Sequence, residues 1–194
     1  MLLRVTQYGE SILRQAGERI TVFDDALERL AADMVETMDA EEGVGLAAQQ
    51  IDKAIMLCVV DVVHLPEEEL DYQLDGLRQP IDLIMPMVLV NPVITEMSGR
   101  TLWGEEGCLS FPGIRGDVPR AETIRVEFQD TGGNPHQLTC SGWFARVVQH
   151  EVDHLNGRLF IDHMDKRQLR LLDSKIKRLK RETRRLHPSA SVSL

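Results

Sequence analysis

His150 and His154 are four residues apart in the segment 149–157, Gln-His-Glu-Val-Asp-His-Leu-Asn-Gly. On an α-helix this spacing places both imidazoles on one face, one turn apart, where they can share a metal ion. Glu151 directly follows the first histidine, so it can handle the protons of an attacking water without being a ligand. Gly157 is a plausible C-terminal stop for such a helix.

Two histidines and a glutamate also occur together by chance on ordinary helices, and a catalytic zinc or iron site usually needs a third protein ligand. Cys108 lies in the segment 104–113, among glycines and turn residues. Tight, non-helical backbone suits a ligand or a nucleophile, but taken alone this segment favours a buried cysteine in a turn. His163 and nearby acids are downstream alternatives for the third ligand.

The length of 194 residues suits one domain, and 43% hydrophobic with 27% charged residues is an ordinary globular balance. No apolar run approaches the roughly 20 residues that span a bilayer, and the N-terminus lacks a signal peptide's apolar stretch. A cytoplasmic location is therefore expected. Three cysteines argue against a disulfide framework; Cys58 is expected in the core, whereas Cys140 is ambiguous.

Residues 42–50, Glu-Gly-Val-Gly-Leu-Ala-Ala-Gln-Gln, place two glycines around one valine. Glycine permits unusual backbone angles and the close approach of a ligand. A phosphate loop fits poorly, because the sequence has neither the G-x-G-x-x-G spacing nor a Walker lysine. A functional loop and a tight loop in a packed corner remain equally supported.

The hydrophobic periodicity predicts a helix followed by several strands. The helix runs from Asp24 or Asp25 to about Ala40, with an apolar stripe that includes two methionines. We expect residues 64–86, with three prolines and an acidic run, to form a surface insertion. The predicted strands are residues 55–63, 87–97 (interrupted at Asn91-Pro92), 123–129 and 136–140.

The net charge of −9 conceals a strong asymmetry. Residues 166–186 hold ten basic and two acidic residues, a net charge of +8, which leaves −17 for the remainder. This segment predicts an amphipathic helix with an apolar seam broken by Thr183; the seam comprises Leu169, Leu172, Ile176, Leu179 and Leu186. An acidic body with a basic tail suggests that the tail meets something anionic.

Three segments taken together resemble the peptide deformylases. Their pattern of Gly-x-Gly-Leu-Ala-Ala-x-Gln, Glu-Gly-Cys-Leu-Ser and Gln-His-Glu-x-Asp-His occurs here in order, at residues 43–50, 106–110 and 149–154. The resemblance implies an α+β fold: a single domain of mostly antiparallel strands around a central metal-site helix, with a C-terminal helix. It covers a catalytic domain at residues 1–165. The sequence itself predicts a basic C-terminal helix at 166–187 and a disordered tail at 188–194.

The resemblance also assigns roles to residues. Cys108 would join His150 and His154 as a metal ligand, leaving a fourth position for water, and one divalent ion per chain follows. The family implies Fe²⁺ in the active form, with Zn²⁺ or Ni²⁺ as substitutes, although intrinsic affinity favours zinc over iron. Glu151 would be the general base and acid.

By the same resemblance, the Gln50 side chain and the Leu109 N–H would stabilise the oxyanion. Gly45 and Gly107 would hold an extended peptide, Val44 and Val147 would line a methionine pocket, and Arg115 would lie near the peptide. Asp153 is expected in a structural salt bridge.

The implied reaction is hydrolysis of the N-formyl group on the initiator methionine of nascent polypeptides, so the expected partners are N-formyl-methionyl peptides and, through the basic helix, the ribosome. No membrane and no sequence-specific DNA partner is expected. The nearest rival is a His-Glu-x-x-His zinc peptidase with its third ligand downstream, for example His163. A metal-stapled RNA-binding module is a second rival, which leaves Glu151 and Gln50 without a role.

Overall fold

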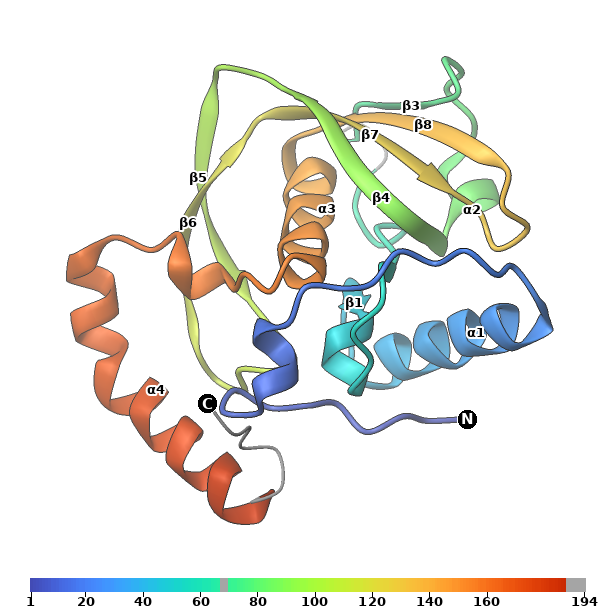
Figure 1. The fold of residues 1–194 in the computed structure, drawn as a ribbon. Helices are drawn as coiled ribbons and strands as arrows, with labels where there is room; N and C mark the ends of the chain where they lie inside the picture. Colours follow the sequence, from blue (N-terminus) through green and yellow to red (C-terminus); the bar gives the residue numbers. More distant parts are fainter. Residues whose placement is uncertain (67–69, 188–194) are drawn as a thin grey trace.

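The computed structural model describes residues 1–66 and 70–187 of the chain. One helix, α3 (Gly142–Leu155), lies at the centre, with a six-stranded sheet on one side and a two-stranded sheet on the other (Figure 1). The predicted α+β fold, a domain of antiparallel strands around a central helix with a C-terminal helix, is confirmed.

The larger sheet has the strand order β1-β2-β4-β7-β8-β3, and every neighbouring pair is antiparallel. The predicted strands at 55–63, 87–97, 123–129 and 136–140 correspond to β2, β4, β7 and β8. Asn91, with φ 53°, does not end β4 but shifts its register against β7. The strands are β1 (Gly45–Ala47), β2 (Leu57–Val60), β3 (Tyr72–Leu74), β4 (Met87–Met97), β7 (Thr123–Gln129) and β8 (Pro135–Ser141).

The smaller sheet is a hairpin of β5 (Thr101–Gly107) and β6 (Arg115–Ala121), in which Gly107 pairs with Arg115. Its sequence does not alternate clearly between apolar and polar residues, and sequence analysis did not predict these two strands. Cys108 follows directly after β5, so this hairpin carries the cysteine toward α3.

Helix α1 (Asp25–Ala40) forms as predicted. The carboxylate of Asp24 caps it by accepting hydrogen bonds from the N–H groups of Ala26 and Leu27, each at 3.0 Å. Its apolar face is buried against β1 and β2 in a cluster that includes Leu27, Met34 and Met38.

Helix α3 is buried along nearly its whole length, in keeping with its central place. Gly157 follows its end with φ 68°, and a Cβ there would lie 2.6 Å from the carbonyl oxygen of Arg14. Only glycine combines this backbone conformation with so close an approach, which explains the C-terminal stop.

The prediction of a surface insertion at residues 64–86 is wrong for the described part of that segment. It contains β3 and the short helix α2 (Ile81–Ile84), and Leu70, Tyr72 and Ile81 are buried in the main core. Tyr72 packs edge-on against Phe144 of α3, with the ring centroids 5.9 Å apart. The segment therefore completes the edge of the larger sheet beside β8.

Helix α4 (Lys166–Leu186) begins at the N-cap Asp165 and runs along the outside of the molecule (Figure 1). Four leucines and isoleucines of its predicted seam, from Leu169 to Leu179, pack on a cluster formed by η1 (Ser11–Arg14), η4 (Phe160–Asp162), β6 and the loop after Cys108. The prediction fails at the C-terminal end of this seam.

Thr183, expected to break the seam, is 4% exposed, whereas Leu186 is 68% exposed. Helix α4 packs closely on the N-terminal segment here, because a Cβ on Gly9 would lie 3.1 Å from the Cβ of Thr183. This close packing leaves no room for a side chain on Gly9. The predicted disordered tail at residues 188–194 lies outside the described residues. The described helices include none that is both long and apolar enough to cross a membrane.

Candidate metal centre and active site

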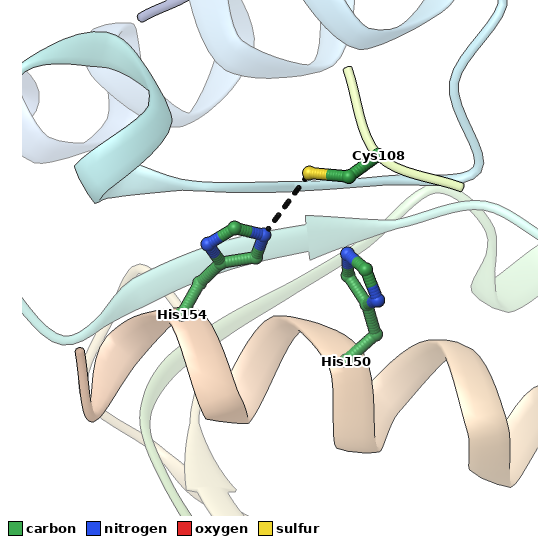
Figure 2. A group of neighbouring side chains, drawn as sticks. All are labelled: Cys108, His150 and His154. Carbon is green, nitrogen blue, oxygen red and sulfur yellow. Dashed lines mark hydrogen bonds between the residues drawn. The ribbon is translucent and has the colours of Figure 1, made fainter. Parts of the chain in front are cut away.

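Two histidines of α3 and the cysteine after β5 face one another (Figure 2). The Sγ of Cys108 lies 3.3 Å from Nε2 of His154, and one ligand atom from each of Cys108, His150 and His154 lies within 4.8 Å of the others. Both histidines are buried, at 8% and 1% exposed. The i, i+4 spacing on one helix face, expected from the sequence, thus produces a compact group of one sulfur and two nitrogens.

This group fits a single metal ion. Thiolate and imidazole ligands together suit zinc or ferrous iron, and neutral imidazole is the form that binds metals. Burial lowers the pKa of His154 well below its ordinary value, which favours that neutral form. Within the described part of the chain, Nδ1 of His154 is buried without a hydrogen-bond partner, whereas Nε2 faces the Cys108 sulfur.

Glu106 fixes the orientation of the His150 ring. Its Oε2 accepts a hydrogen bond from His150 Nδ1 at 2.9 Å, which leaves Nε2 as the free ring nitrogen. Burial alone would raise the pKa of the Glu106 carboxyl, but hydrogen bonds from Arg120 and His150 hold that pKa far below its usual range. Glu106 therefore remains an ionised acceptor.

Glu151 lies beside the metal-binding group and is 3% exposed. Burial raises the pKa of its carboxyl to about 7, and its Oε2 has no hydrogen-bond partner among the described residues. A Cβ on Gly45 would lie only 2.3 Å from Glu151 Oε1. Any residue other than glycine at position 45 would therefore clash with the carboxylate. A carboxyl with a pKa near neutrality can both accept and release a proton.

Gln50, in η2 (Ala48–Ile51), also contacts the metal-binding group. Its Oε1 accepts a hydrogen bond from the N–H of Ala47 at 2.8 Å, which fixes the orientation of the amide. Its Nε2 donor then points toward Cys108 Sγ, at 3.4 Å, and Ser110 Oγ, at 3.3 Å. An amide donor is thereby aimed at the space beside the metal-binding group.

One cleft of about 480 Å³ is lined by all the predicted site residues except His154, which is buried. Val147 is buried in the cleft lining, whereas Val44 is 39% exposed at the rim. Arg115 is also at the rim, exposed, with its guanidinium 3.5 Å from Glu105. The cleft residues that sequence analysis predicted are Val44, Gly45, Gln50, Gly107, Cys108, Leu109, Arg115, Val147, His150 and Glu151.

The downstream histidine is occupied elsewhere. His163 Nε2 lies 2.8 Å from Asp153 Oδ2, and Asp153 also forms an ion pair with Arg120. Asp153 thus has the structural salt bridge expected of it. Among the described residues, the group that could hold a metal includes Cys108 and not His163, which removes the geometric basis for the peptidase alternative.

Sequence analysis assigned no role to Glu106, to Ser110 or to three other buried polar residues of this site, namely Arg120, Arg146 and Gln149, each 5% exposed. Arg120 donates two hydrogen bonds to Glu106, and Gln149 exchanges two with the backbone of Ala121. The signal was present for Arg146, because a charged residue in the apolar run before His150 must find a partner when the helix is central.

Comparison with known proteins places the chain in a family. The sequence profile of the polypeptide deformylases matches residues 2–170. The peptide deformylase of Opitutus terrae is 51% identical over 185 residues, covering 95% of this chain and 96% of the relative. That of Methylacidiphilum infernorum is 38% identical and covers 93% and 94%.

The chain belongs to the peptide deformylase family. Its fold matches the crystal structure of Arabidopsis thaliana peptide deformylase 1B with a TM-score of 0.83 at 30% identity, covering 96% of this chain and 94% of that one. The Thermus thermophilus enzyme gives a TM-score of 0.78 at 36% identity, covering 94% and 100%. Peptide deformylases are metalloenzymes that remove the N-formyl group from nascent polypeptides, and this is the activity of the family to which the chain belongs.

Proposed function

We propose that this chain hydrolyses N-formyl-methionyl peptides with one divalent metal ion held by Cys108, His150 and His154. The observation that carries the proposal is the meeting of this group with the buried Glu151 in one cleft. When bound, the metal lowers the pKa of water and polarises a carbonyl group. Three protein ligands are the number that catalytic sites of this kind use, so this set would leave the ion able to bind a water molecule.

Glu151 supplies the proton transfers. It takes a proton from the water that attacks the formyl carbon and delivers it to the departing amine nitrogen, so the C–N bond breaks and formate leaves. Its unpaired Oε2 is available for this exchange. The wall formed by Gly45 keeps the carboxylate in place.

Gln50 and the backbone N–H of Leu109 stabilise the negative charge that develops on the formyl oxygen. The Gln50 amide is held by Ala47, so its donor needs no reorientation as the charge develops. Leu109 follows Cys108 directly and also lines the cleft, which supports this role.

The cleft walls bind the peptide. Gly45, the first residue of β1, and Gly107, the last residue of β5, both line the cleft. An extended peptide between them would pair with their backbones. Val44 and Val147 give apolar walls for the methionine side chain. Arg115 lies near the peptide at the rim, where its exposed guanidinium remains accessible.

We propose Fe²⁺ as the metal of the active form, with Zn²⁺ or Ni²⁺ as substitutes. A set of one thiolate and two imidazoles accepts all three ions, so availability and turnover, rather than ligand type, distinguish them. Loading the protein with each ion in the absence of oxygen and comparing turnover tests this assignment.

The decisive experiment follows formate release from formyl-Met-Ala-Ser by protein loaded anaerobically with Fe²⁺ or Zn²⁺. Glu151→Gln should lower kcat by at least ~10²-fold while metal content stays stoichiometric. Cys108→Ser should lower the bound metal itself. Glu127→Gln, which changes an exposed glutamate of β7, is the matched control and should behave as the parent chain. Full activity of Glu151→Gln would disprove the assignment of the general base.

Ribosome binding through α4 is a further part of the proposal. Nine of the ten basic residues of α4 are exposed while its seam packs on the body, which makes them accessible to phosphates. Lys177 and Arg178 form exposed ion pairs within the helix, and Lys180 lies over the ring of Tyr8. Reversing Lys175, Arg178 and Arg181 to glutamate should abolish co-sedimentation with empty ribosomes at low salt. Reversing Arg19, Arg29 and Lys53 changes the net charge equally and should preserve it. Binding insensitive to salt, or equally lost in both variants, would contradict this role. The cytoplasmic location stays a prediction.

A further inference from the structure

Arg146 lies one helical turn before His150 on α3, on the same helix face, and lines the cleft. Its side chain is 6% exposed, and the site roles proposed above give it nothing to do. A buried guanidinium is costly unless all its donors are satisfied. The partners of Arg146 therefore indicate what its presence achieves.

The guanidinium spans the two-stranded sheet. One terminal nitrogen donates to the carbonyl oxygens of Gly104, at 3.3 Å, and Val118, at 2.8 Å, and the other donates to that of Leu102, at 2.7 Å. Leu102 and Gly104 belong to β5, and Val118 belongs to β6. One side chain of α3 thus binds the backbone of both strands of the hairpin.

The same guanidinium also reaches the metal-binding group through Glu106. It donates to Glu106 Oε1 at 2.9 Å, while Glu106 Oε2 accepts from His150 at 2.9 Å. Glu106 in turn lies two residues before Cys108 on the hairpin. Arg146 is therefore connected to the histidines along α3 and to the cysteine along β5.

The hairpin is shaped to receive this arginine. A Cβ on Gly104 would lie 3.0 Å from the guanidinium carbon and from one of its nitrogens, tighter than ordinary side-chain contacts. Glycine at this position leaves room for the planar group against the strand. Arginine suits the place because its fork presents several donors in fixed directions, which a lysine ammonium cannot reproduce.

We propose that Arg146 is a positioning residue that sets the distance between Cys108 and the two histidines. Cys108 and the histidines lie on different elements, and the guanidinium joins these elements just before the metal-binding group. The proposal rests on the proposed ligand set. Truncating Arg146 should loosen the hairpin, so that the cysteine no longer meets a metal held by the histidines.

The test measures Co²⁺ binding to the metal-free protein by absorption spectroscopy. Co²⁺ reports its ligands directly, through a near-ultraviolet thiolate band and visible bands that depend on coordination geometry. Arg146→Leu removes the clamp, Arg146→Lys keeps the charge without the fork, and Gly104→Ala pushes on the guanidinium while leaving Arg146 in place. Arg100→Leu is the matched control, because this arginine precedes the same strand but pairs with Glu122 in solvent.

We expect Arg146→Leu and Gly104→Ala to weaken Co²⁺ affinity by about 10–100-fold and to diminish the thiolate band, with Arg146→Lys intermediate. The control should match the parent chain. Thermal unfolding of the metal-free variants shows which of them fold. Folded variants that keep parental affinity and an undiminished thiolate band would overturn the inference.

The proposed ligand set fails in a different way. In that case the parent chain itself would show no thiolate band, and Cys108→Ser would leave the Co²⁺ affinity unchanged. A parent chain with the band, together with Arg146 variants that keep it, would overturn only the positioning role.

Discussion

The two sheets are attached to helix α3 by different means. On the six-stranded side, buried apolar residues of α3, including Phe144 and Val148, pack against Leu89 and Val126 of the sheet. On the two-stranded side, α3 presents Arg146 and Gln149, whose buried side chains bond to the backbone of the hairpin. One helix therefore has an apolar face toward the larger sheet and a polar face toward the hairpin and the site.

The two kinds of contact contribute differently to the stability of the fold and to the geometry of the site. Apolar burial is non-directional and contributes in proportion to the area removed from water, so it secures the scaffold without fixing every atom. Hydrogen bonds to ionised groups are short and directional, so they fix the hairpin that carries Cys108 against the helix that carries the histidines. Changes on the two sides should therefore have different effects.

The largest expected effect on stability lies on the apolar side. Leu89 in β4 is fully buried, opposite Cys58 of β2, and Leu89→Ala should lower the free energy of unfolding by about 3 kcal/mol, because a cavity adds to the lost transfer energy. Urea denaturation measures this change. Leu83→Ala, at a residue that is 72% exposed, is the control. Metal affinity of the folded Leu89→Ala protein should stay within about twofold of the parent; a larger loss would break the comparison.

A smaller stability change but a larger effect on the site is expected on the polar side. The Gln149 amide accepts from the N–H of Ala121, at 3.0 Å, and donates to its carbonyl, at 2.9 Å, tying the end of β6 to α3. Gln149→Leu leaves both backbone groups unpaired and should cost about 1–3 kcal/mol in urea denaturation. Metal affinity should fall more than in Leu89→Ala. Gln137→Leu, at an exposed glutamine of β8, should change neither quantity.

The smallest effect is expected for an exposed charged contact on the larger sheet. His136 Nδ1 lies 2.7 Å from Asp75, and hydrogen bonds to Asp75 and then Asp130 raise the pKa of His136, while the pKa of each carboxyl is lowered. The contribution of the histidine is complete below its unfolded pKa and is lost as pH rises through its raised folded pKa. That of the carboxyls is lost in acid.

The stability difference between the parent chain and His136→Asn should therefore be greatest near pH 5–6 and decline above neutrality, remaining below about 1 kcal/mol. Urea denaturation across pH 4–9 measures it. A difference of several kcal/mol would mean that charged contacts also hold the larger sheet, and the contrast between the two sides would fail.

The parts of the fold that the sequence predicted are those with local signals. The Asp24 cap and the apolar stripe after it define α1, and the spacing of His150 and His154 brings both rings to one helix face. Alternation defines β7 and β8. These patterns depend only on near neighbours in the chain, so they can be recognised without knowing what packs against them.

Tertiary contacts decided the rest. Tyr72 is buried because it packs on Phe144, some seventy residues further along the chain. The prolines of the segment 64–86 favoured a surface loop instead, so the burial of Tyr72 was not predicted. Thr183 is buried because α4 approaches Gly9, although its side chain is polar. The β5–β6 hairpin was missed because its attachment to α3 depends on hydrogen bonds from Arg146 and Gln149, which leave no clear apolar alternation in its sequence.

The central helix also has a consequence for biosynthesis. Every strand in the described parts of the chain precedes α3, yet α3 packs against β1, β2 and β8, so the middle of the molecule is synthesised after its surroundings. Contacts such as that of Gly45 with Glu151 close loops of about a hundred residues, which slows folding. Until α3 has been synthesised, the sheet faces that it covers in the folded protein remain exposed to solvent. Apolar surface exposed in this way favours aggregation. A protein that acts on nascent chains thus passes through a vulnerable nascent state of its own.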